Sequence, residues 1–277
     1  MDIRPTLIGL SALLTACGNP GPTGNQDETR TDTVLARGST PSTGPVVAPP
    51  DARVQVVEAP PAQAYHQTSL AVDVAPLSNQ NEARFDFSVS GFELKQQTPD
   101  APERGCANSP DGQHIHFILN NEPYLAKYEP SFTEKVEPGH NVLLAFLSRS
   151  YHESVKDPSA FVVKEFDMPG NSDVRGNIDR YANLFYSRPK GDYKKSDGER
   201  VLLDFYLVNA ALSPEGLRVR ATIDGQSFLL TKWAPYFIEG LELGEHTVRL
   251  ELVDRDGHVV PGPFNDSGPR TFHLTEG

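Results

Sequence analysis

The amino-acid sequence predicts an all-β protein: two tandem immunoglobulin-like β-sandwich domains after a disordered tether. Short apolar–polar alternations begin at about residue 68, punctuated by Gly, Pro, Asn and Asp, as strands and turns require. Helical periodicity is nearly absent. The alternating segments fall into two sets that align with each other, so we expect one structural unit to occur twice.

Length and charge limit the class of protein. The chain has 277 residues, enough for one large domain or two ordinary ones. It carries 25 Lys+Arg against 37 Asp+Glu, a formal net charge of −12. We expect no nucleic-acid partner, because phosphate binding needs basic surface. No apolar run reaches the roughly 20 residues of a membrane-spanning helix, so we expect a soluble or merely tethered chain.

Residues 1–17 have the layout of a secretory signal peptide, with Arg4, an apolar stretch and small residues before Cys17. The segment LTAC at residues 14–17 resembles the bacterial lipobox. This resemblance implies that Cys17 becomes the lipidated first residue of the mature chain and attaches it to a membrane. We therefore expect the bacterial cell envelope, periplasmic or surface-exposed, with the outer membrane as the favoured membrane.

Residues 18–67 are the predicted tether. They are rich in Pro, Gly, Thr and Ser and lack an aromatic residue before Tyr65. Such a stretch buries too little apolar surface to offset its ordering entropy. Its prolines favour extended geometry, so the tether should hold the folded part away from the membrane.

Residues 68–168 form the first predicted sandwich and residues 182–277 the second, with a linker at 169–181. Alternation places apolar residues on one face of each strand, and the spacing of the strands fits an immunoglobulin-like sandwich. Asn120-Asn121 and Asp224-Gly225 suit two-residue hairpin turns. The alternating sets are Phe85/Phe87/Val89, Ile115/Phe117/Leu119 and Val142/Leu144/Phe146, then Leu203/Phe205/Leu207, Val219/Ala221/Ile223 and Val248/Leu250/Leu252.

The first repeat concentrates histidines. His114 and His116 alternate on one strand and so share a face, and His152 lies in the hairpin SRSYHE. Two histidines on one strand face and a third from a neighbouring element form a partial ligand shell for copper or zinc. His140 and Cys106 are candidates to complete it.

Structural interpretations of the same residues stay open. His114 and His116 also suit an exposed sheet face, where alternation leaves polar side chains. His140 has a counterpart in His246, which indicates a structural role at a strand entry. With Cys17 lipidated, Cys106 has no disulfide partner in the chain, so it is a buried small hydrophobe, a free thiol or an intermolecular link.

The segment SRPKG, with Arg188 and Lys190, is the one basic cluster of the acidic chain. Arg suits planar bidentate contact and Lys supplies a point charge, so these two residues are candidates for an anion or carboxylate site. The alternative is a solvated turn between the domains.

Catalytic motifs are absent: the chain has no G-x-S-x-G elbow, no phosphate-binding glycine loop and no HExxH. Asp254-x-Asp256-Gly257 lacks the downstream Glu of a calcium loop and is interpreted as a turn. Trp233 is expected in core or interdomain packing. We therefore expect a binding module, not an enzyme.

The first repeat and the segments after it resemble a known family. Those segments are GQHIHFILNNEPYLAKYEPSF, VLLAFLSRSYHESVK, LFYSRPKGDY, VLLDFYLVN, TKWAPYFIEGL and GEHTVRLELVD, within residues 84–274. They are similar to uncharacterised bacterial surface lipoproteins, known chiefly from Bacteroidetes-type genomes and sometimes labelled phosphopeptide-binding. The first repeat is also similar to short periplasmic domains with an H-x-H strand, a Pro-Gly-x-His turn and a later His. His114, His116 and His152 match that pattern, whereas His140 is displaced by one position.

These features predict a membrane-anchored extracytoplasmic binding lipoprotein. The expected ligand is a transition metal, copper or zinc, at the histidines of the first sandwich. One alternative is a peptide, phosphopeptide or glycan bound by Arg188 and Lys190 or by an exposed sandwich face, with a protein or peptide partner at the envelope. Another is a purely structural module in surface assembly.

Overall fold

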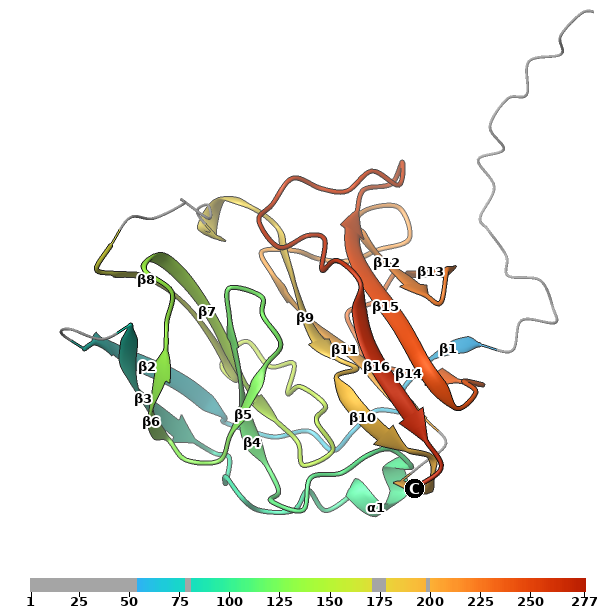
Figure 1. The fold of residues 1–277 in the computed structure, drawn as a ribbon, viewed down its shortest axis with the longest axis horizontal. Coiled ribbons are helices and arrows are strands. Elements are labelled where there is room, and N and C mark those ends of the chain that lie inside the picture. Colours follow the sequence, from blue (N-terminus) through green and yellow to red (C-terminus); the bar gives the residue numbers. More distant parts are fainter. Residues whose placement is uncertain (1–53, 78–80, 171–177, 198–199) are drawn as a thin grey trace, which may run out of the picture. The chain divides into compact units, whose positions relative to one another are not determined.

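A computed structural model describes residues 54–77, 81–170, 178–197 and 200–277. The predicted signal peptide, Cys17 and the tether up to residue 53 lie outside the described residues. Within the described ranges, no helix is long and apolar enough to cross a membrane. Almost all regular structure there is β-strand (Figure 1).

The first sandwich pairs a three-stranded sheet with a four-stranded sheet. The three-stranded sheet has the order β2-β3-β6, and the four-stranded sheet has the order β5-β4-β7-β8. All these pairings are antiparallel. The strands are β2 (Ser69–Pro76), β3 (Glu82–Ser90), β4 (His114–Leu119), β5 (Leu125–Lys127), β6 (Ser131–Lys135), β7 (Gly139–Ser148) and β8 (Phe161–Met168). A short helix, α1 (Ala101–Arg104), lies in the β3–β4 connection.

The second sandwich has the same layout in its larger sheet. The order β13-β12-β15-β16 repeats β5-β4-β7-β8, as the internal repeat predicts, and β10 adds to β16 in parallel. The facing sheet has the order β1-β14-β11-β9. The strands are β1 (Gln55–Glu58), β9 (Asn183–Arg188), β10 (Gly191–Lys194), β11 (Val201–Val208), β12 (Arg218–Ile223), β13 (Gln226–Leu230), β14 (Tyr236–Glu239), β15 (Gly244–Val253) and β16 (Arg270–Thr275). Two short 3-10 helices, η1 (Ile178–Arg180) and η2 (Lys195–Asp197), lie before β9 and after β10.

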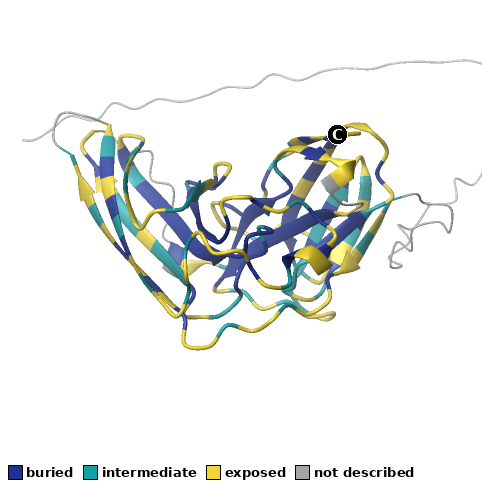
Figure 2. Cartoon of the chain, turned by 90° about the horizontal axis from the view of Figure 1, so that it is seen from below, coloured by how far each residue is buried: buried dark blue, intermediate teal, exposed yellow. Residues whose placement is uncertain are grey.

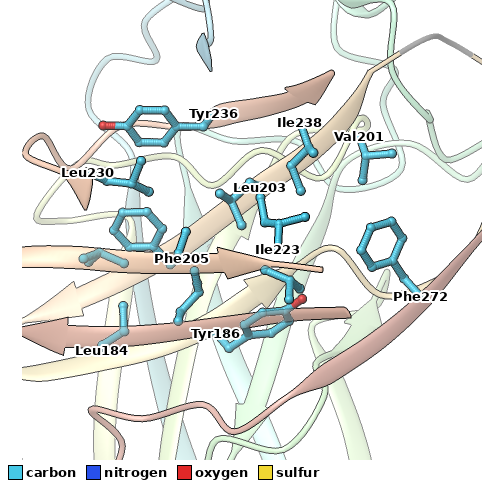
Figure 3. Packing of buried hydrophobic residues seen from close by; sticks show 14 of the residues in the cluster. Leu184, Tyr186, Val201, Leu203, Phe205, Ile223, Leu230, Tyr236, Ile238 and Phe272 are labelled. Atoms are coloured by element: carbon cyan, nitrogen blue, oxygen red, sulfur yellow. The ribbon is translucent and has the colours of Figure 1, made fainter. Parts of the chain in front are cut away.

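Alternation builds both cores. In the second sandwich the predicted sets on β11, β12 and β15 all enter one buried cluster, which also takes Tyr186 and Phe272 (Figure 3). In the first sandwich Phe85, Phe87, Ile115 and Phe117 do the same. Burial of these side chains removes apolar surface from water, which is the main favourable contribution to folding.

The hairpin turns differ between the copies. Asp224 and Gly225 both have positive φ, 47° and 82°, and Ile223 pairs directly with Gln226. This is the predicted two-residue turn. Asn120 and Asn121 also have positive φ, but the ladder resumes only at Phe117 and Leu125. The first repeat therefore keeps the turn but extends the loop after it.

The predicted tether boundary at residue 67 is wrong. Residues 55–58, within the expected tether, form β1, which pairs with β14 at the edge of the second sandwich (Figure 1). The pairing occurs because β14 offers free backbone groups at its edge, and Val56 packs against the apolar core of that sandwich. The chain therefore contacts the second sandwich before it enters the first.

The two sandwiches share a third apolar cluster. Val142, Leu144 and Phe146 of β7 pack there with Phe185 of β9 and Tyr206 of β11. The predicted set does share one face of β7, but that face meets the second sandwich, whereas Leu143, Ala145 and Leu147 enter the core of the first. Both faces of β7 are therefore covered, and nearly all of its residues are buried. In Figure 2 the inner strands are buried along their length, whereas buried and exposed residues alternate along the outer strands.

Candidate functional site

The histidine cluster lies where the second sandwich covers the first. His114 and His116 point from β4 toward β9, on the same face as Ile118, and both are fully buried. The interpretation that they lie on an exposed sheet face is wrong. Their face is closed by β9, whose Ser187 hydroxyl lies 3.1 Å from Nδ1 of His116.

Three imidazole nitrogens converge at one point. Nε2 of His114 lies 3.0 Å from Nε2 of His116 and 3.1 Å from Nδ1 of His152. One ring nitrogen of each of the three histidines lies within 4.8 Å of those of the other two. The structure thus brings together the three histidines that the sequence pattern predicts.

The outer ring nitrogens set the proton positions. Nδ1 of His114 lies 2.8 Å from the carbonyl oxygen of Gly112 and donates to it, since a carbonyl only accepts. Nε2 of His114 therefore presents its lone pair to the cluster in the neutral ring. A histidine oriented in this way by its second nitrogen is the usual arrangement of a metal ligand.

Burial keeps the cluster neutral. Desolvation lowers the pKa of His114 to about 4. It also lowers the pKa values of His116 and His152 well below the usual range, and the charge of Arg188 acts in the same direction on both. Metal ligation requires the neutral imidazole. All three rings are therefore in the metal-binding protonation state at neutral pH.

A buried ion network holds the turn that carries His152. Arg149 donates its backbone N–H to the carbonyl of Glu153 at 2.9 Å, and His152 adopts a φ of 68° inside this turn. The Glu153 carboxylate accepts from Arg104 at 2.6 Å and lies 3.3 Å from Nε of Arg149. All three charged side chains are almost completely buried. The network therefore fixes the direction in which His152 points.

Arg188 and Lys190 adjoin the same centre. Arg188 is only 7% exposed and Lys190 is partly buried, so the interpretation as a solvated turn is wrong for Arg188. The ring of Tyr124 stacks on His116 with centroids 3.7 Å apart, and the cationic groups of Arg188 and Lys190 lie 5.1 and 4.6 Å from that ring. Arg188 therefore offers no open basic surface to a peptide or glycan.

Cys106 and His140 do not join the cluster. His140 lies at the start of β7, whereas Ser148 at its end pairs with His114. Its ring contacts Glu165 and Asp167, both at 3.0 Å. Cys106 is a buried free thiol in a separate apolar cluster with Tyr151, and desolvation raises its pKa to about 11. The role of both as completing ligands is not supported by their positions.

Two minor predictions have clear positions. The Asp254 carboxylate accepts from the backbone N–H groups of Asp256 and His258 at 2.9 Å, which makes the segment a turn. Trp233 packs edge-on against Tyr206, with centroids 4.9 Å apart, in the cluster between the sandwiches.

A separate cavity of about 630 Å³ lies away from the histidines. It is lined from both sandwiches, by Asn120 and Asn121 on one side and by Phe264 and Arg270 on the other. Tyr181, 42% exposed, lines the same cavity. The structure thus has room for a larger ligand at this place, which the sequence pattern did not indicate.

Sequence reasoning missed Tyr124, Ser187 and Tyr193 at the histidine site. Tyr124 and Ser187 contact His116, and Tyr193 bonds to Arg188. The sequence carried one signal for this closure, the uninterrupted apolar run VLLAFL at residues 142–147. Such a run is typical of a strand buried on both faces.

No protein-family model matches the chain, and no curated protein matches it. Among solved structures, it is similar to the Clostridium thermocellum CbhA fibronectin(III)-like modules, with 12% identity and a TM-score of 0.24, over 74% of this chain and 93% of that one. It is also similar to SGBP-B of the Bacteroides ovatus mixed-linkage glucan utilization locus in complex with a mixed-linkage heptasaccharide, with 12% identity and a TM-score of 0.22, over 80% and 70%. At these sequence identities and TM-scores, the two similar structures give no information about the function of this chain.

Proposed function

We propose that this chain is a binding protein that holds one copper or zinc ion through His114, His116 and His152. The convergence of three imidazole nitrogens from β4 and the 149–153 turn carries this proposal. Zinc–nitrogen bonds of about 2.0–2.1 Å in a tetrahedral arrangement place ligand nitrogens about 3.3 Å apart. The His114–His116 and His114–His152 distances of 3.0 and 3.1 Å are slightly shorter than this value, and the third pair of nitrogens lies within 4.8 Å, so small movements of the rings bring all three nitrogens to zinc.

The ligand set is chemically suitable. Imidazole suits zinc and copper, and three protein ligands leave a coordination position for another group. Ser187 can fix His116 through its Nδ1, as the Gly112 carbonyl fixes His114. Three imidazole nitrogens that converge in a buried site suit the binding of a metal ion.

Added metal should stabilise the protein. A ligand that binds only the folded state at about 100 times its Kd raises the free energy of unfolding by about 2.7 kcal/mol. We expect zinc or copper to raise the Tm of the metal-free protein, and His116→Gln and His152→Gln to abolish this shift. The exposed His66→Gln variant is the matched control and should keep it.

Circular dichroism melts in a non-coordinating buffer measure this. The metal-free variants must first be shown to fold, by their spectra without metal. An equal metal-induced shift in His116→Gln and in the unsubstituted chain would assign the effect to other residues and refute the proposal.

We further propose that the protein is anchored at the bacterial cell envelope through Cys17, as a member of the lipoprotein family that its segments resemble. The lipobox-like segment LTAC at residues 14–17 supports this. Expression in a bacterium should place the chain in the membrane fraction, and Cys17→Ser should move it to the soluble fraction because the acyl chains are then absent. Membrane fractionation that is identical for both would count against the anchor.

A further inference from the structure

Arg188 has one buried hydrogen-bond donor, Nε, that no group of the described residues accepts. Its Nη1 donates to the hydroxyl oxygen of Tyr193 at 2.7 Å. Its Nε is buried and has no hydrogen-bond partner among the described residues. Nε lies on the Nε–Nη2 edge, with which a guanidinium binds planar anions.

Tyr193 presents a second unused donor beside it. Its hydroxyl oxygen accepts from Nη1 of Arg188 and from the backbone N–H of Lys190, the latter at 3.0 Å. In the part of the chain that the structure describes, no acceptor takes the hydroxyl proton itself. Tyr193 is 4% exposed, so this proton is largely withdrawn from bulk water.

The charge around these donors is also uncompensated. Among the described residues, no carboxylate forms an ion pair with Arg188 or Lys190. Burial has the largest effect on the pKa of Arg188, and the ionisable side chains with the next largest effects are Tyr193 and Tyr124. Burial raises the pKa of Tyr124 well above its usual value, so Tyr124 carries no negative charge at neutral pH. A buried cation without a counter-charge is costly, so the centre favours a negative ligand.

We propose that Arg188 and Tyr193 form a binding site for an oxyanion that presents two coplanar oxygens, a carboxylate or a phosphate. The Nε–Nη2 edge of Arg188 donates to both oxygens, and the Tyr193 hydroxyl donates to one of them. Lys190, whose Nζ already donates to the carbonyl of Tyr124 at 2.6 Å, contributes positive charge. Ser187 and Arg188 are adjacent on β9, so the same strand serves the histidine cluster and the anion.

This site goes beyond the metal-binding function and is coupled to it. Tyr124 contacts His116 on one hand and the cations Arg188 and Lys190 on the other. A bound anion lowers the positive charge that a metal ion meets, and a bound metal favours the anion by the same factor. The anion site does not require the metal, because its donors, Arg188 and Tyr193, are not metal ligands.

The test uses the full chain freed of metal and titrated with acetate in one series and inorganic phosphate in another. Chloride keeps the ionic strength constant. We expect a saturable rise in Tm with at least one of the two anions, which also identifies the class. Arg188→Gln should weaken anion binding at least tenfold, and Tyr193→Phe should weaken it several-fold.

Lys194→Gln is the matched control, because it removes one positive charge from an exposed neighbour on β10, and it should bind the anion as the unsubstituted chain does. Tyr193→Phe keeps the ring and so tests the hydroxyl even where Arg188→Gln folds poorly. No saturable response to either anion, or equal responses in Tyr193→Phe and Lys194→Gln, would overturn the proposal and assign the free donors to water. Metal binding is measured separately, in a buffer without acetate or phosphate, so a negative result for the anion site does not bear on the metal site.

Discussion

Glu153→Ala is expected to lower the free energy of unfolding by about 3–5 kcal/mol, because removing one partner of a buried ion pair leaves the other charge uncompensated. Here two guanidinium groups, those of Arg104 and Arg149, lose their carboxylate in a buried environment. Urea denaturation monitored by tryptophan fluorescence or circular dichroism measures the change.

The same substitution should also weaken metal binding. Glu153 directly follows His152, and its carboxylate supports the turn from which His152 points to the cluster. Loss of such an outer support typically costs about 10- to 100-fold in metal affinity. Competition with a chelator of known affinity measures this.

Glu129→Ala provides the matched control. Glu129 pairs with Lys95 on the surface, where both side chains are more than half exposed, and exposed pairs contribute about 0–1 kcal/mol. A loss of stability in Glu153→Ala no larger than in Glu129→Ala would show that the buried network does not stabilise the turn.

Tyr206→Ala is expected to cost about 3–5 kcal/mol, as for other large aromatic side chains removed from a packed interior. Tyr206 is fully buried and stacks on Phe146 of the first sandwich at 4.8 Å, while Trp233 packs against it at 4.9 Å. Its removal leaves a cavity in the cluster that joins the sandwiches.

Scanning calorimetry distinguishes this interface effect from a local one. Because the sandwiches share one cluster, the unsubstituted chain should unfold in one transition, and Tyr206→Ala should lower its Tm and broaden or split it. Leu229→Ala, at a 46% exposed position on β13, should change stability by less than about 0.5 kcal/mol. A Tyr206→Ala transition that superimposes on that of Leu229→Ala would contradict the shared interface.

The sequence predicted the strands and the repeat because both follow from local alternation. Phe85, Ile115 and Leu203 enter their cores as a two-residue period requires. The same rule failed for Val142, Leu144 and Phe146, because every residue of that run is apolar and periodicity cannot assign the faces. The structure assigns them to the contact between the sandwiches.

The histidine site was predictable in part. His114 and His116 share a face because they alternate on β4, and His152 is close because its hairpin joins the end of the paired strand β7. The burial of this face was not predictable, since it depends on β9, about 70 residues further along the chain. The equivalent residues of the second repeat, Arg218 and Arg220, have no covering sandwich and remain partly exposed. Tertiary contact thus explains why one copy accommodates neutral histidines and the other accommodates arginines.

Cys106 and His140 were predicted as further metal ligands from their residue types, but they lie away from the cluster. Their residue types suit a metal site, but residue type alone gives no distance. His140 and Ser148 lie on the same strand, eight residues apart, and Ser148 is at the end of the strand that pairs with His114. At about 3.3 Å per residue, His140 is too far from the cluster to share its ion. Counting along the strand would have removed it from the predicted ligand set.

The central claim is that His114, His116 and His152 bind one metal ion, and X-ray absorption spectroscopy at the zinc edge of the zinc-loaded protein tests it most directly. We predict a first shell that contains three imidazole nitrogens at about 2.0–2.1 Å, with the multiple-scattering pattern of histidine rings. A first shell of oxygen ligands without imidazole scattering would contradict the account.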